Sequence, residues 1–171
     1  MTIYWIVLAV VMFQRGMELF IARRNEIWMK GRGAKEFGEE HYLLVVLLHG
    51  SFFVFLTAEV WYREAELIPW WLVLGIAFFT VQIIRFWVLV SLGRYWNTKI
   101  IVLPGEKIVK KGPYKWVSHP NYWVVAMELL ILPLLFGAYM TAILFTLLNA
   151  AFLLLIRIPQ EDEALRLLNQ E

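Results

Sequence analysis

The residues best suited to chemistry lie in two short stretches of the second half of the chain. The first, Gly112–Tyr122, holds a histidine, two prolines and two tyrosines. The second begins at Arg157 and continues into the acidic pair Glu161 and Asp162. The two carboxylates could accept hydrogen bonds from ribose hydroxyls or an amino group. A helix that starts at Pro120 would offer free backbone N–H groups to an anion. We therefore expect ligand binding and chemistry here.

The elements that position these residues must lie in a membrane. The chain has 171 residues, of which 61% are hydrophobic, including nine Trp and twelve Phe. Its apolar residues form runs long enough to cross about 30 Å of hydrocarbon, which takes roughly 20 helical residues. A net charge of +2 is too small to indicate nucleic acid binding, and the absence of cysteine excludes disulfides and a thiol nucleophile. The composition predicts an all-α integral membrane protein.

The apolar runs predict about five transmembrane helices. Their expected ranges are about 3–23, 42–61, 68–92, 120–136 and 138–156. Residues 23–41 and 93–119 are polar, and we expect both to be loops, the second with a short extended piece at residues 100–103. A short amphipathic helix is expected in the tail after Pro159. No composition break divides the chain, so residues 1–171 are expected to form one domain.

Basic residues predict the orientation of the chain. The first polar loop carries five and the second carries six, whereas the link after the second helix carries only Arg63. By the positive-inside tendency, the two loops and the C-terminus are cytoplasmic and the N-terminus is outside. The N-terminus lacks the basic start and cleavage site of a signal peptide, so we expect it to be retained as the first helix.

Several charged residues fall inside apolar runs. Arg15 and Glu18 share one helical face, and we expect them to form an ion pair that fixes the first helix in the bundle. Glu128 lies two turns inside the membrane from His119 and needs a partner, for which Arg85 and Arg15 are the candidates. The sequence leaves open whether these residues, and also His49 and Glu59, are structural or contact a substrate.

Each candidate site residue also fits a purely structural role. Tyr114 and Tyr122 could be interfacial anchors, and Pro120 is a common first residue of a helix. Glu161 and Asp162 could favour the start of the tail helix. Their occurrence together at one membrane face is what favours a functional site.

The combined pattern resembles the isoprenylcysteine carboxyl methyltransferase family, whose motifs are Gly-Pro-Tyr-Arg, Arg-His-Pro-x-Tyr and, after a helical hairpin, Arg-x-x-x-Glu-Glu. The corresponding stretches of this sequence are Gly112-Pro113-Tyr114-Lys115, Ser118-His119-Pro120-Asn121-Tyr122 and Arg157 with Glu161-Asp162. The resemblance covers roughly residues 93–165. Lys115, Ser118 and Asp162 depart from the usual Arg, Arg and Glu, which indicates a branch with a different substrate. The small size is similar to the bacterial branch.

The resemblance implies S-adenosylmethionine as the cofactor. It would be bound in a cytoplasmic pocket formed by the 93–119 loop and the C-terminal tail, within a cofactor-binding half of about 93–171. The cofactor contacts implied by the family motifs are Tyr114, His119, Pro120, Tyr122 and Glu161. Arg157 would lie beside the methyl acceptor. The chemistry needs alignment and an ionised acceptor, and no metal is implied.

The membrane setting favours a lipophilic acceptor and contact with membrane lipid. Bacterial members of the family are linked with O-methylation of long-chain alkylpyrones or phenolic lipids, so we expect an O-methyltransferase of a bacterial cell membrane. Within the same class, the acceptor could be a prenylcysteine carboxylate or a phospholipid amine. Two other classes remain open: an NADPH-dependent sterol or enone reductase, and a small transporter whose path is lined by Arg15, Glu18, Arg85 and Glu59.

Overall fold

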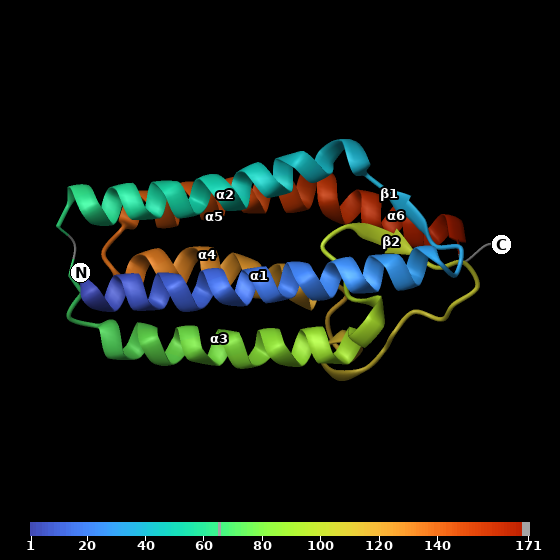
Figure 1. Ribbon diagram of the computed structural model, residues 1–171, viewed down its shortest axis with the longest axis horizontal. Helices are drawn as coiled ribbons and strands as arrows, with labels where there is room; N and C mark the ends of the chain where they lie inside the picture. The colour runs from blue at the N-terminus through green and yellow to red at the C-terminus, as the bar shows by residue number, and fades with distance from the viewer. Residues whose placement is uncertain (65, 169–171) are drawn as a thin grey trace.

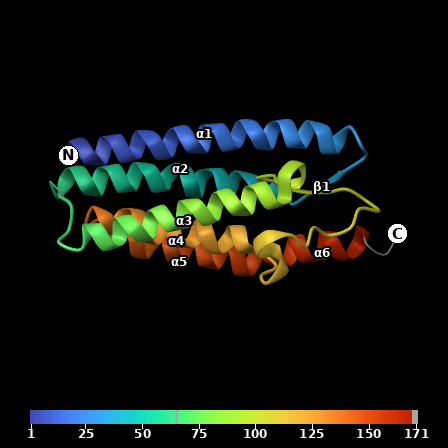
Figure 2. The same cartoon turned by 90° about the horizontal axis from the view of Figure 1, so that it is seen from below.

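Long apolar helices lie side by side along the length of the molecule (Figure 1). The computed structural model describes residues 1–64 and 66–168. The helices are α1 (Thr2–Lys30), α2 (Glu39–Tyr62), α3 (Trp71–Leu92), α4 (Pro120–Leu135), α5 (Tyr139–Phe152) and α6 (Ile158–Leu168). A π-helical turn, Leu153–Arg157, joins α5 to α6. Seen from below, α1 and α5 lie on opposite outer sides of the bundle (Figure 2).

The helices confirm an all-α integral membrane protein that crosses the membrane several times. α1, α2, α3 and the run formed by α5 with its continuation are long and apolar enough to span a bilayer. α4 is apolar but shorter. Large apolar side chains such as Phe13 and Leu155, 72% and 77% exposed, cover the outside of the bundle. Such an outer surface is compatible with hydrocarbon and not with water.

Three predicted boundaries are wrong. α1 continues to Lys30, because the ion pairs Arg23–Glu26 and Lys30–Glu26 support its last turns. α3 begins at Trp71 and not near residue 68, because proline disfavours the helical conformation of the residue before it and Pro69 falls there. The last predicted helix does not end near residue 156. Its backbone passes through the π-helical turn directly into the tail helix.

Two short strands form within the stretches expected to be loops. β1 (Lys35–Phe37) pairs antiparallel with β2 (Ile100–Val102). Ile100 and Ile101 are buried. The strands lie beside α6, at the end of the bundle opposite the start of α1 (Figure 1). We call this end the site end.

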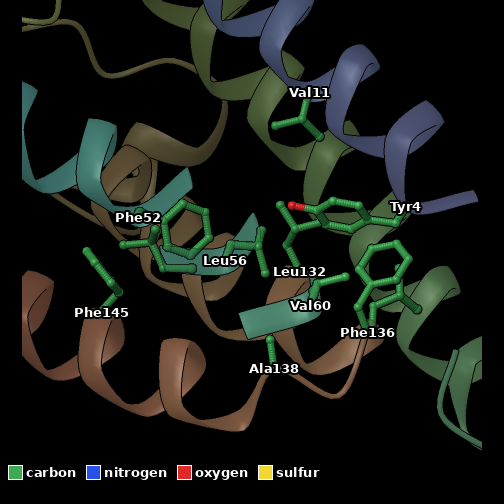
Figure 3. Packing of buried hydrophobic residues seen from close by; sticks show 11 residues of the cluster. Tyr4, Val11, Phe52, Leu56, Val60, Leu132, Phe136, Ala138 and Phe145 are labelled. Carbon is green, nitrogen blue, oxygen red and sulfur yellow. The ribbon is translucent and has the colours of Figure 1, made fainter. Parts of the chain in front are cut away.

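A hydrophobic cluster closes the opposite end of the bundle. It joins α1, α2, α4 and α5 through residues such as Tyr4, Phe52, Leu56 and Phe136 (Figure 3). Tyr4 also hydrogen-bonds to Thr57 Oγ1 at 2.7 Å. The helices that carry the site end are therefore fixed at their far ends by the packing of this cluster.

Four charged side chains meet inside the bundle. Arg15 Nη1 lies 2.7 Å from Glu18 Oε2, and Arg15 Nη2 lies 2.6 Å from Glu128 Oε2. Arg85 Nη1 lies 2.8 Å from Glu128 Oε2, and Arg85 also donates to Glu18. Both expected partners of Glu128 are therefore present. The group balances its charge and links α1, α3 and α4, whereas Glu59 lies elsewhere and accepts from Thr141 at the start of α5.

Candidate active site

Four of the predicted site residues come together where α4 begins and α6 begins. Tyr122, in the first turn of α4, donates its hydroxyl hydrogen to Glu161 of α6. Arg157 Nε donates to the Tyr122 hydroxyl oxygen at 3.1 Å. The ring of His119 stacks on that of Tyr122, with centroids 5.3 Å apart and planes 11° apart. Residues distant in sequence therefore form one hydrogen-bonded group.

His119 also contacts both acidic residues of the tail. Its Nδ1 lies 3.7 Å from Glu161 Oε1, and its Nε2 lies 3.1 Å from Asp162 Oδ1. The bond to Glu161 raises the pKa of His119 above its ordinary 6.5, and contact with Asp162 adds to this, although burial opposes it. The imidazole is therefore held as a cation over a wider pH range than a free histidine.

The π-helical turn explains how Arg157 reaches this group. Asn149 belongs to the buried face of α5. In a regular helix, the residue seven positions later, Ile156, would follow it on the same face. The wide turn contains an extra residue, so Arg157 takes that place and is only 9% exposed. π-helical turns within helices occur often at functional sites.

Arg157 is fixed from a second side. Its Nη2 donates to the backbone carbonyl oxygen of Thr98 at 2.8 Å. Thr98 belongs to the 93–119 segment, so this bond joins the segment to the tail. Sequence reasoning missed this contact, because any residue type can supply a backbone carbonyl.

Tyr114 and Pro120 occupy different parts of the same region. Pro120 is buried as the first residue of α4, directly after His119. Tyr114 packs beside a cluster that includes Val88 and Val124. Burial raises the pKa of Tyr114, and the negative charge of Glu161 adds to the effect, so its hydroxyl remains protonated. Within the part of the chain that the structure describes, Tyr114 forms no hydrogen bond to the central group, and its ring lines the region as a neutral side chain.

Two buried polar atoms near the start of α4 and the end of α3 have no hydrogen-bond partner among residues 1–64 and 66–168: Asn121 Oδ1 and Trp96 Nε1. Asn121 directly follows Pro120 in α4. Buried polar atoms are usually paired, so each of these two atoms is available to bond to a ligand or a water. The sequence placed Asn121 inside a motif without giving it a role. Within the described residues, no group of His, Asp or Glu side chains is arranged to hold a metal ion.

Comparison with known proteins identifies the family of this chain. The model of the isoprenylcysteine carboxyl methyltransferase (ICMT) family matches residues 72–167, which is more than half of the chain. The chain belongs to the ICMT family. The matched region contains every candidate site residue from Tyr114 to Glu161, and this ICMT family is one of S-adenosylmethionine-dependent membrane methyltransferases.

Two bacterial relatives match this chain along nearly its full length. Uncharacterized protein YpbQ of Bacillus subtilis strain 168 is 49% identical over 163 residues, covering 95% of this chain and 96% of that protein. An uncharacterized protein of Haemophilus influenzae strain Rd is 28% identical over 166 residues, covering 94% and 93%. No solved structure matches the chain. The relatives place it in a small bacterial branch and do not name an acceptor.

Proposed function

We propose that this protein transfers a methyl group from S-adenosylmethionine to an oxygen atom of a lipophilic substrate. The observation that carries the proposal is the bonded group of Tyr122, Arg157, Glu161 and His119. It joins the stretch 118–122 to Arg157 and Glu161. These correspond to two motifs of the family, which a helical hairpin separates in the sequence. Reaction at this group needs alignment of two substrates more than a nucleophile supplied by the protein.

The side chains present suit the cofactor. We assign its contacts to Tyr114, His119, Pro120, Tyr122 and Glu161. A Glu161 carboxylate can accept from ribose hydroxyls, and the backbone N–H groups that begin α4 can donate to the carboxylate of the amino acid part. The unpaired Asn121 Oδ1 is a further acceptor for a bound amino group. When bound, S-adenosylmethionine supplies a methyl group on a cationic sulfur, which is already strongly electrophilic.

Arg157 is assigned to the methyl acceptor. Arg157 is mostly buried, so its guanidinium can stabilise a negative oxygen strongly. Two of its nitrogens are held by Tyr122 and Thr98, which fixes the guanidinium plane. An acidic hydroxyl of the acceptor would release its proton to water and present its oxygen to the methyl group as an anion paired with this cation.

An apolar groove supports a lipophilic acceptor. It lies between α2 and the α5 side of the bundle and has a volume of about 460 Å³. Its lining includes Leu44 and Leu47 of α2 on one side and Leu155 and Ile156 on the other. Because Ile156 precedes Arg157, a hydrocarbon tail in this groove would have its polar head at the level of Arg157 along the helix.

The acceptor class that fits best is a long-chain alkylpyrone or a phenolic lipid. The hydroxyl of such a ring is acidic enough to ionise near a cation. Lys115, Ser118 and Asp162 depart from the family pattern, which favours an acceptor other than a prenylcysteine carboxylate. A phospholipid amine has no acidic hydroxyl for Arg157 to stabilise.

The other classes have less support. A transporter path needs accessible charges, but Arg15, Glu18, Arg85 and Glu128 pair with one another, and Glu59 binds the start of α5. A reductase would bind NADPH. It is distinguished by which nucleotide raises the melting temperature of the detergent-solubilised protein. We also propose a bacterial cell membrane location with the C-terminus in the cytoplasm.

The proposal is tested with methyl-labelled S-adenosylmethionine and a lipid extract rich in alkylpyrones and phenolic lipids. Wild-type protein is expected to label a lipid product. Arg157→Gln is expected to lower kcat at least about 100-fold, because an oriented charge that stabilises the reacting oxygen is lost. Arg166→Gln, on the same helical run but exposed, serves as the matched control and should retain activity. Equal labelling by the Arg157 variant would remove its assigned role, and labelling of protein or amine products alone would reject the acceptor class.

A further inference from the structure

The segment that leads into α4 returns to the end of α3 and lies directly on it. Beyond β2 the chain extends past the helix ends and then turns back (Figure 1). Gly112 makes the contact: a Cβ atom there would lie 2.1 Å from Ser91 Oγ and 3.0 Å from Trp87 Nε1. Its φ of +53° is also unfavourable for other residues. The close approach fixes the returning backbone against the last turn of α3.

A pair of tryptophans marks the depth of this contact. Trp116 packs edge to face on Trp87, with ring centroids 6.1 Å apart. Trp116 is 73% exposed and Trp87 is 46% exposed. Exposed tryptophans of membrane proteins collect at the boundary between hydrocarbon and headgroups. The pair therefore places Gly112 and its neighbours at that boundary.

Three lysines flank the same contact. Lys110, Lys111 and Lys115 are exposed, and within the described residues none of them forms an ion pair with a carboxylate. Two other lysines of the site end differ, since Lys30 and Lys99 each contact both Glu26 and Glu36. Unpaired cations at headgroup depth, beside exposed indoles, have the chemistry that an anionic lipid requires.

We propose that Lys110, Lys111, Lys115 and Trp116 form a binding site for the headgroup of an anionic phospholipid. The ammonium groups contact the phosphate, and the Trp116 ring lies at the level of the glycerol backbone. This site is separate from methyl transfer and does not depend on the proposed function. It holds the segment that carries Tyr114 and His119 against the bilayer surface.

The site is tested in nanodiscs with lipids that carry bromine on their acyl chains, which quench nearby tryptophans. The difference between wild type and Trp116→Phe isolates the signal of Trp116 among the nine tryptophans. Brominated phosphatidylglycerol is expected to quench Trp116 more strongly than brominated phosphatidylcholine does. In Lys110→Gln/Lys111→Gln, that preference should fall about 25-fold, or about fivefold for each lysine near an anionic surface.

Two controls separate the possible explanations. The matched variant Lys110→Arg/Lys111→Arg keeps the charge and should keep the preference. Added inorganic phosphate should not displace the lipid, because the site lies at the bilayer surface. Equal quenching by both lipids in wild type, an unchanged preference in the glutamine variant, or loss of the preference on adding phosphate would each overturn the proposal.

Discussion

At the scale of single residues, Tyr122 connects the two halves of the site. Its hydroxyl donates to Glu161 and accepts from Arg157. One phenol thus holds a carboxylate assigned to the cofactor and a cation assigned to the acceptor. The sequence motifs named all three residues, but only the fold shows that they share one hydrogen-bond chain.

His119 provides a pH-dependent prediction. Because its pKa is raised in the folded protein, its contribution to stability is complete below about pH 6.5 and is lost as pH rises through the raised pKa. The melting temperature of the detergent-solubilised protein should therefore fall by about 2–4 °C across that range. In His119→Gln this fall should be absent, as measured by scanning fluorimetry at several pH values. An identical pH profile for both proteins would contradict the assignment.

The buried charges give a second prediction. Arg85→Leu leaves Glu18 and Glu128 to share Arg15 alone, and breaking such a buried group is expected to cost about 3–5 kcal/mol. The double variant Arg85→Leu/Glu18→Leu keeps the pair of Arg15 and Glu128 and should be more stable than the single one. Unfolding in mixed detergents would measure both. A single variant as stable as wild type would show that the group does not fix the helices.

At the scale of elements, the π-helical turn decides where the tail points. Inserting one alanine after Leu154, which is 66% exposed, should add a residue to this turn and rotate Arg157, Glu161 and Asp162 by about 100° away from α4. Helix content should persist, while affinity for S-adenosylmethionine should fall about 100-fold, because displaced binding groups lose most of their effect. Calorimetry and circular dichroism measure the two quantities.

The control for this insertion is Leu154→Ala, which keeps the residue count and should bind as wild type does. If the insertion variant binds normally, the register set by this turn does not position the site. Hydrophobic periodicity predicted the helices on both sides of this turn. It contained no sign of one extra residue, because lipid-facing leucines fill the whole stretch.

Other elements were predictable to different degrees. Apolar length predicted α1 to α5, and the ion pair of Arg15 and Glu18 followed from helical spacing. The extended piece expected at residues 100–103 contains β2, but β1 and its pairing with β2 were missed, because each strand has only three residues and its partner lies about 65 positions away. The hydrogen bond between Gln160 Nε2 and His41 Nδ1, which are 2.8 Å apart, was also missed, because the two residues are 119 positions apart in the sequence.

At the scale of the whole molecule, both polar stretches and the tail lie at one end of the bundle (Figure 2). Arg63 lies after α2, at the other end. This separation agrees with the charge distribution from which we expect a cytoplasmic site. The chain contains no cysteine, so one introduced thiol reports the side of the membrane without background.

The orientation predicts opposite labelling of two variants. Tyr62→Cys, at a residue 89% exposed at the end of α2, should react with a membrane-impermeant thiol reagent on intact cells. Lys107→Cys, in the segment between β2 and α4, should react only after the membrane is opened. The reverse pattern would place the site outside the cytoplasm.

Equilibrium binding of S-adenosylmethionine by calorimetry tests the central claim most directly. Wild type and Glu163→Gln, an exposed neighbour in α6, should bind with equal affinity. Glu161→Gln should bind at least about tenfold more weakly, because a charged hydrogen bond to the nucleotide is lost. No binding heat with wild type, or equal affinity in the Glu161 and Glu163 variants, would contradict the account.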